Sequence, residues 1–159
     1  MIQGDGLFES RMQRIIEWGQ CDPAGIVFFP RYWEMGDFAT ATLLARATGM
    51  PKNEMIDHFG IVGVPVVALD GSFHAPCSFG EEVEITSTVE SLGRTSFAVK
   101  HQFRRGSLLC VELDERRVWA VRGTGGASDI SAAPLPEPLV RILSGRESVA
   151  AALAGNRND

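Results

Sequence analysis

The feature that most limits how this chain can fold is one long helical segment followed by strands that hairpin turns connect. Pro30 suits a first helical position, because its missing N–H has no partner there, and Gly49 followed by Pro51 is a typical helix end. We therefore predict a helix over Pro30–Thr48, whose many glycine and alanine residues allow a covering layer to approach closely. A short helix is predicted over Lys52–Phe59, after which the chain takes on β character.

The rest of the chain is dominated by segments that alternate between apolar and polar residues. From Phe97 to Phe103 every second residue belongs to the apolar side of the pattern. A period of two residues is typical of a strand in a sheet with one hydrated face. Turns are predicted at Asp70-Gly71, Leu92-Gly93 and Arg105-Gly106. The predicted strands are Phe8–Trp18, Val64–Leu69, Ser72–Cys77, Glu82–Ser91, Ser96–Arg104 and Leu108–Arg122. One strand, a long helix and then antiparallel strands indicate an α+β fold, without the alternation of a parallel sheet.

Length and composition favour one domain. A chain of 159 residues that is 45% hydrophobic can bury a substantial core, and we predict a single domain over residues 1–145. Gly123–Pro138 is rich in Gly, Ser, Ala and Pro and is predicted to be a loop, followed by a weak helix at Leu139–Leu143. Residues 146–159 are predicted to be a frayed C-terminal tail.

Charge and cysteine content narrow the partners and the compartment. A net charge of −5 argues against general binding to nucleic acid or anionic membranes. No stretch approaches the roughly 20 apolar residues of a membrane span, and the first residues do not resemble a secretion signal. The three cysteines are widely spaced, which indicates reduced thiols. We therefore expect a cytoplasmic protein whose partner is a small molecule.

The loop from Cys21 to Pro30 carries the strongest chemical signal. It places one carboxylate, Asp22, in an apolar and almost uncharged segment that opens directly into the long helix. Partial desolvation makes a carboxylate a better nucleophile or base, and free N–H groups at a helix start can receive an oxyanion. The pattern predicts acyl-transfer chemistry centred on Asp22.

Two motifs carry a resemblance to a known family. The loop Cys21-Asp22-Pro23-Ala24-Gly25-Ile26-Val27 and the segment Gly60-Ile61-Val62-Gly63-Val64-Pro65-Val66-Val67 resemble the 4-hydroxybenzoyl-CoA thioesterase family of hot-dog-fold acyl-CoA hydrolases. The similarity runs roughly from Arg11 to Arg122. It implies a curved antiparallel sheet around the long helix, and a homodimer or homotetramer with active sites between subunits. It also implies an acyl-CoA substrate, with no cofactor beyond the coenzyme A that the substrate carries.

The resemblance also implies roles for individual residues. Asp22 matches the catalytic aspartate, which attacks the thioester carbonyl or activates water, and the backbone N–H of Phe29 matches the group that polarises that carbonyl. Asp37 matches an aspartate that reaches the hydroxyl of the substrate ring from the opposing subunit; the alternative is a helix carboxylate that faces solvent or an arginine. Further substrate contacts are expected at Tyr32, Gly63, Val64 and Pro65.

Coenzyme A is expected to bind at the turn Gly93-Arg94-Thr95-Ser96, where the family has a basic cluster that contacts nucleotide phosphates. The residues concerned are Arg94, Thr95 and Ser96, and the alternative is that Arg94 is an ordinary solvated turn residue. Two departures from the hydroxybenzoyl-specific branch, Phe29 in place of a tyrosine and Val64 in place of a threonine, make the expected pocket more apolar.

Other functions stay open at this point. The chain could be a thioesterase for short or medium acyl-CoA or for acyl carrier protein, or a hot-dog protein that binds acyl-CoA without hydrolysing it. A hydratase is disfavoured, because such enzymes pair a carboxylate with a histidine and no such constellation is visible among His58, His74 and His101. These histidines lack ligand spacing, so no metal site is expected, and His101 is predicted to be a hydrogen-bonded core residue.

Overall fold

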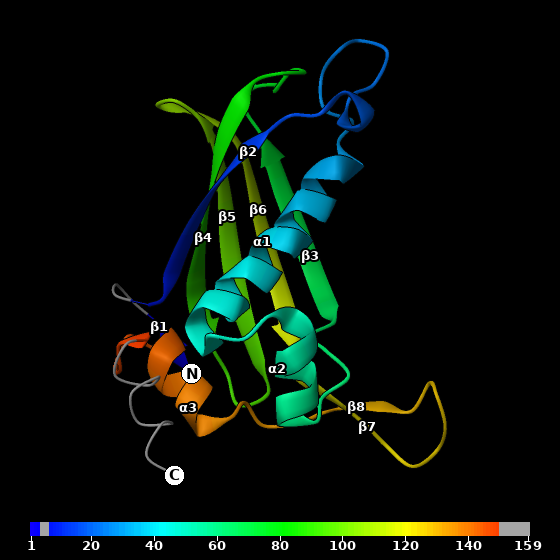
Figure 1. Cartoon of the computed structure of the whole chain (residues 1–159), viewed down its shortest axis with the longest axis vertical. Coiled ribbons are helices and arrows are strands. Elements are labelled where there is room, and N and C mark those ends of the chain that lie inside the picture. Colours follow the sequence, from blue (N-terminus) through cyan, green and yellow to red (C-terminus); the bar gives the residue numbers. More distant parts are fainter. Residues whose placement is uncertain (4–6, 150–159) are drawn as a thin grey trace.

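The computed structural model describes residues 1–3 and 7–149, and an antiparallel sheet that curves around one long helix dominates it (Figure 1). Its helices are α1 (Pro30–Thr48), α2 (Lys52–Phe59), α3 (Glu137–Leu143) and the short 3₁₀ helix η1 (Trp18–Gln20). Its strands are β1 (Ile2–Gln3), β2 (Glu9–Ile15), β3 (Val66–Phe73), β4 (Glu82–Leu92), β5 (Ser96–Arg105), β6 (Leu108–Val118), β7 (Ala120–Arg122) and β8 (Ile130–Ala132).

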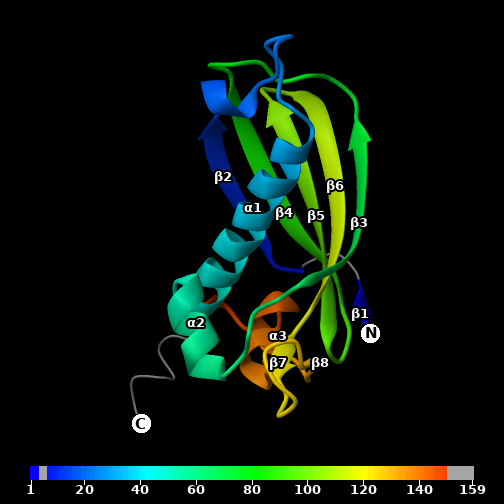
Figure 2. The same cartoon turned by 90° about the vertical axis from the view of Figure 1, so that its right-hand side faces the viewer.

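The main sheet has the strand order β1-β4-β5-β6-β3, and β2 also pairs with β4. Every pairing is antiparallel. Helix α1 crosses the concave side of this sheet, while α2, α3 and the β7–β8 pair gather at one end of the molecule (Figure 2). The α+β hot-dog fold predicted from the sequence is therefore confirmed.

Local signals set the limits of α1 where the sequence predicts them. Pro30 is its first residue, and Gly49 ends it with a φ of 70° and an N–H that donates to the carbonyl of Ala45. A glycine inside the helix favours close packing as well, since a Cβ on Gly36 would lie 3.3 Å from the side chain of Leu113 on β6. The small residues of α1 thus allow the sheet to approach the helix closely.

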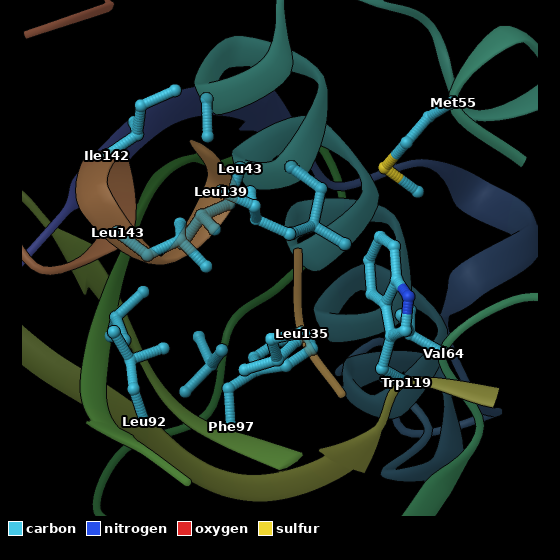
Figure 3. Close-up of a cluster of buried hydrophobic side chains, with 14 of the residues drawn as sticks. Leu43, Met55, Val64, Leu92, Phe97, Trp119, Leu135, Leu139, Ile142 and Leu143 are labelled. Atoms are coloured by element: carbon cyan, nitrogen blue, oxygen red, sulfur yellow. The ribbon is translucent and has the colours of Figure 1, made fainter. Parts of the chain in front are cut away.

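The core consists of two apolar clusters on the helix side of the sheet. The first joins the C-terminal half of α1 to α2, α3 and the ends of β4 and β5; Leu43, Phe97, Trp119 and Leu143 are each at most 2% exposed (Figure 3). The second lies nearer the start of α1 and its members include Ile16, Tyr32, Ile85, Phe103 and Leu113. Burial of these side chains supplies the main stabilising free energy of the fold.

The predicted turn at Asp70-Gly71 is wrong. Instead of two strands, Val64–Leu69 and Ser72–Cys77, the chain forms the single strand β3, in which Asp70 lies opposite Asp114 and Gly71 opposite Leu113 on β6. A Cβ on Gly71 would lie 3.1 Å from the ring of Trp33. This glycine makes room for a tryptophan instead of forming a turn.

The predicted strand Leu108–Arg122 is also divided. It breaks at Trp119, which is 2% exposed in the core and whose N–H donates to the carbonyl of Thr95. The part after the break is β7, which pairs with β8 inside the segment Gly123–Pro138 that the sequence indicates as a loop. The first strand also ends earlier than predicted, at Ile15 instead of Trp18.

The C-terminal segment is described only in part. Helix α3 contains the predicted helix Leu139–Leu143 and begins two residues earlier. Of the predicted tail, Glu147 forms an ion pair with Arg141 at 2.9 Å and Val149 packs against the first apolar cluster. Residues 150–159 lie outside the described part of the chain.

Candidate active site

The loop that carries Asp22 is a tight, hydrogen-bonded turn. The N–H of Asp22 donates to the carbonyl of Ile26, and the N–H of Gly25 donates to the carbonyl of Asp22, both at 2.9 Å. The Asp22 side chain contributes as well, since its Oδ1 accepts the N–H of Ala24 at 2.8 Å. Among the described residues, Oδ2 of Asp22 has no hydrogen-bond partner. The half-buried carboxylate is therefore held by one oxygen and leaves the other available.

A surface hollow surrounds this carboxylate. Its lining includes Gly19, Pro23, Phe28 and Arg31, so the site is less purely apolar than the loop sequence indicates. The guanidinium of Arg31 is engaged by Glu34 at 2.7 Å. A carboxylate with one free oxygen in an open hollow can act as a base or a nucleophile toward a bound acyl group.

The start of α1 provides a free donor. Phe29 is the N-cap of α1, and its N–H has no acceptor among the described residues. Unpaired N–H groups at a helix N-terminus carry the positive end of the helix dipole and stabilise negative charge. The side chain of Phe29 lines a second hollow, together with Val27, Tyr32 and Phe73.

Tyr32 is held mainly inside the fold. It is 3% exposed, its hydroxyl accepts the N–H of Cys77 at 3.3 Å, and its ring meets Phe103 edge-on. Burial is the main cause that raises the pKa of Tyr32, so its hydroxyl stays neutral. Within one chain Tyr32 supports the wall of the hollow and holds the segment around Cys77.

A separate pocket brings together three residues that the sequence assigns to substrate binding. Asp37 of α1 lines it with Gly63 and Val64, and the other polar residues of its wall are Thr40, Lys52 and Arg117. Leu44 and Met55 are among its apolar residues. Pro65, the remaining expected contact, is exposed and directly precedes β3.

Gly63 is required at this pocket for its backbone conformation. Its φ is 139°, in the range that favours glycine, and it forms an isolated antiparallel bridge with Ala120. The bridge fixes the segment 63–65 against the end of the sheet, across the pocket from Asp37.

Behind Asp37 lies a buried polar cluster that the sequence did not predict. Arg117 contacts Asp37 at 2.8 Å and forms a two-point contact with Glu115 at 2.7 and 2.8 Å. Glu115 also accepts a hydrogen bond from Thr40 and lies 3.3 Å from Nε2 of His101. Burial alone would raise the pKa of Glu115, but hydrogen bonds from His101 and Arg117 outweigh it and lower the pKa to about 2.

The position of His101 confirms one expectation and corrects another. It is a hydrogen-bonded core residue, with 0% exposure and Nδ1 2.8 Å from the hydroxyl of Ser87. The expectation that no histidine pairs with a carboxylate is wrong, because His101 lies 3.3 Å from Glu115 and His74 lies 3.0 Å from Glu112. Burial keeps His101 and Glu115 from contact with a substrate, whereas His74 and Glu112 are partly exposed. The inward orientation of Glu115 and Arg117 could have been predicted from the sequence, because they continue the every-second-residue pattern of Val111 and Leu113, whose side chains face inward.

The expected coenzyme A turn lies far from Asp22 within one chain. Gly93-Arg94-Thr95 connects β4 to β5, closed by the N–H of Gly93 on the carbonyl of Ser96 at 2.8 Å. Arg94 is exposed, and its side chain has no partner among the described residues. The turn sits at the opposite end of the sheet from the Asp22 loop (Figure 1). A single copy therefore does not bring the predicted catalytic and coenzyme A residues together.

Within the described ranges, no group of three or more His, Cys, Asp and Glu side chains is placed to hold a metal ion. No helix of those ranges combines the length and apolar character needed to cross a bilayer.

Comparison with known proteins decides the family. A family model described as the thioesterase-like superfamily matches residues 16–152. The chain belongs to this family. It is 34% identical over 115 residues to the 4-hydroxybenzoyl-CoA thioesterase of Pseudomonas sp. strain CBS-3, covering 69% of this chain and 82% of the relative. It is also 28% identical over 92 residues to a 1,4-dihydroxy-2-naphthoyl-CoA hydrolase of Synechococcus elongatus, covering 58% of this chain and 67% of that enzyme.

Solved structures of the thioesterase family agree with the sequence match. The 4-hydroxybenzoyl-CoA thioesterase of Pseudomonas superposes with a TM-score of 0.77 at 29% identity, covering 84% of this chain and 98% of that one. A gentisyl-coenzyme A thioesterase superposes with a TM-score of 0.72 at 30% identity, covering 82% and 98%. The predicted family and the prediction of a thioester hydrolase are therefore confirmed.

Proposed function

We propose that this thioesterase hydrolyses an aromatic acyl-CoA, resembling 4-hydroxybenzoyl-CoA, to the free acid and coenzyme A. The relatives named above act on hydroxylated aromatic acyl groups, by their names 4-hydroxybenzoyl, gentisyl and dihydroxynaphthoyl. The observation that carries the proposal is the available oxygen of Asp22 in an open hollow at the approach to α1.

In this proposal Asp22 supplies the base or nucleophile and Phe29 supplies the oxyanion donor. The carboxylate either attacks the thioester carbonyl, giving an acyl anhydride that water hydrolyses, or removes a proton from the attacking water. The N–H of Phe29 receives the negative charge that develops on the carbonyl oxygen. A thiolate is a stable leaving group, so a nucleophile and an oxyanion donor suffice.

The complete site requires a second copy of the chain, as the resemblance implies. Strand β3 pairs only with β6 among the described strands, which leaves its outer edge open. Its apolar side chains Val67, Leu69 and Phe73 are 58%, 50% and 51% exposed. An open apolar edge invites strand pairing with another copy.

Pairing of β3 with its symmetry mate would be antiparallel, and this orientation joins the separated parts of the site. The segment 63–65 precedes β3 at one end, and the hollow lined by Phe29 and Phe73 lies at the other. A twofold axis through the strand therefore places the Phe29 end of one copy beside the 63–65 end and Asp37 of its mate. The dimer or tetramer, the cytoplasmic location and the absence of a further cofactor stay predictions.

A thiol-release assay across aromatic, short-chain and long-chain acyl-CoAs tests the substrate. We expect the highest kcat/KM for hydroxylated benzoyl groups. A preference for aliphatic chains would instead support the short- or medium-chain alternative. No hydrolysis of any acyl-CoA would support a protein that only binds them.

The variant Asp22→Asn tests the mechanism. The amide oxygen of Asn can still accept the N–H of Ala24, so we expect the loop to keep its turn. We expect kcat to fall at least roughly a hundredfold, a change of about 3 kcal/mol in the barrier, with a smaller change in KM. Asp114→Asn, on the exposed face of β6, is the matched control. Near-full turnover in Asp22→Asn would remove this residue from the mechanism.

A further inference from the structure

One nitrogen atom joins the two segments that face each other across the Asp37 pocket. Nη1 of Arg117 lies 2.8 Å from Oδ1 of Asp37 on α1 and donates to the carbonyl of Val64 at 3.2 Å. Asp37 and Val64 are both expected to contact the substrate, and they are brought together from separate parts of the chain. Arg117 therefore sets the separation and relative orientation of two pocket walls.

The guanidinium that makes this bridge is itself fixed from behind. Its Nε and Nη2 atoms donate to the two oxygens of Glu115, and its side chain is 5% exposed. Thr40 donates to Glu115, and His101 lies against it, which anchors the carboxylate in turn. Together with the hydrogen bond to Val64 and the ion pair with Asp37, all three nitrogen atoms of the guanidinium are engaged. Such a guanidinium has one orientation available.

The Asp37 side chain, by contrast, reaches the open part of the pocket. It is 53% exposed, and its Oδ2 has no partner among the described residues. A half-exposed aspartate on a helix surface would normally exchange between rotamers. The contact with Arg117 holds Oδ1 and leaves Oδ2 as a directed acceptor. A carboxylate oxygen accepts hydrogen bonds, so the complementary group on a substrate is an O–H or N–H donor.

We infer that Arg117 is a positioning residue that orients Asp37 to accept a hydrogen bond from a hydroxyl at the distal end of the acyl group. This inference rests on the proposed function and deepens it, because it assigns selection for a hydroxylated ring to the pair and not to Asp37 alone. Arg117 does not serve as a receptor for a substrate carboxylate, since its side chain is 5% exposed and each of its three guanidinium nitrogens already contacts Glu115, Asp37 or Val64.

The test compares 4-hydroxybenzoyl-CoA with benzoyl-CoA, which differ only in the hydroxyl. A hydrogen bond to a charged group predicts that the wild type prefers the hydroxylated substrate by about tenfold or more in kcat/KM. Arg117→Lys keeps the charge, but one ammonium cannot occupy Glu115 with a fork and bridge Asp37 to Val64 as well. We expect this variant to lower the preference at least about fivefold, through a larger rise in KM for the hydroxylated substrate.

Two further variants separate positioning from a structural role. Arg116→Lys changes the neighbouring, exposed arginine of β6 and should leave the preference unaltered. Asp37→Asn should lower the preference, and adding Arg117→Lys should lower it little further, because both changes remove one interaction. Thermal unfolding of each variant measures the contribution of the cluster to stability independently of the substrate.

The outcomes are distinguishable. A folded Arg117→Lys variant with the wild-type preference, or equal losses on both substrates, would overturn the inference and leave a purely structural ion cluster. Full additivity of the two variants in the preference would overturn it too. A wild type that hydrolyses both substrates equally would refute the inference while the aromatic thioesterase proposal stands. A wild type inactive on both would refute the proposed function, and the inference with it.

Discussion

Removal of the charge on Glu115 should destabilise the protein strongly at neutral pH and weakly in acid. The carboxylate is 6% exposed and receives hydrogen bonds from Arg117 and Thr40, with His101 beside it. In Glu115→Gln the guanidinium of Arg117 stays buried but loses its buried charged partner, and the half-exposed Asp37 is the charged group that still contacts it. Breaking a buried ion pair in this way typically costs about 3 to 5 kcal/mol.

The acid dependence follows from the pKa of Glu115. Burial opposes ionisation, but the bonds to His101 and Arg117 prevail and lower the pKa from 4.5 to about 2. At about 1.4 kcal/mol for each pKa unit, this lowering corresponds to about 3 kcal/mol of stability. The pKa of Glu115 is lower in the folded state than in the unfolded state. Its contribution to the free energy of unfolding is therefore fully present above pH 4.5 and is lost as the pH falls toward 2. Glu115→Gln should lack that loss.

Urea unfolding, followed by tryptophan fluorescence at a fixed protomer concentration, measures both effects. We expect the gap in unfolding free energy between the wild type and Glu115→Gln to be about 3 kcal/mol at pH 7 and to shrink steadily below pH 4.5. Glu112→Gln is the control, because Glu112 lies on the other face of β6, pairs with His74 at 3.0 Å and is partly exposed. Surface pairs of this kind contribute about 1 kcal/mol or less. A gap that stays constant down to pH 2.5, or a Glu115→Gln variant as stable as the wild type, would refute the reasoning.

Three further changes test other parts of the structure. Gly71→Ala would place a Cβ 3.1 Å from the Trp33 ring and 3.2 Å from Leu113, so urea titration should show a loss of about 1 to 3 kcal/mol; an unchanged midpoint would contradict this packing. Leu69→Lys on the open edge of β3 should shift the proposed dimer toward monomer in light scattering and reduce turnover, and an unchanged dimer would exclude β3 from the interface. Arg94→Ala should raise KM for an acyl-CoA and weaken its salt dependence; an unchanged KM would exclude the phosphate contact.

Features governed by neighbouring residues were predictable from the sequence. Pro30 and Gly49 delimit α1 as predicted. Proline fits the first helical position, where no N–H is needed, and Gly49 adopts the left-handed conformation that ends a helix. The hairpin turn at Gly106 follows from the same conformational freedom, since its φ is 58°, whereas Gly93 forms its turn without a positive φ. The alternation over β4 and β5 indicated which face is buried. Gly71 shows the limit of this reasoning, since a glycine that accommodates Trp33 looks the same in the sequence as one that forms a turn.

For the candidate site too, the sequence indicates individual residues, whereas their arrangement is visible only in the structure. Asp22 could be selected from its loop alone, and Asp37 and the segment 63–65 from the family resemblance. That Asp22 and Arg94 are far apart within one chain became visible only in the structure, where their two loops lie at opposite ends of the sheet (Figure 1).

By itself, the sequence determined the helices, most strands, the family and the aspartate of the loop, because these depend on residues adjacent in the chain or on a motif. The tertiary structure alone decided that Glu115 and Arg117 are buried as charged groups. Thr40 lies 75 residues from Glu115 in the chain, and Asp37 is still further from Arg117. A buried charge is tolerated only where folding brings hydrogen-bonding partners to it, and no local pattern records that arrangement.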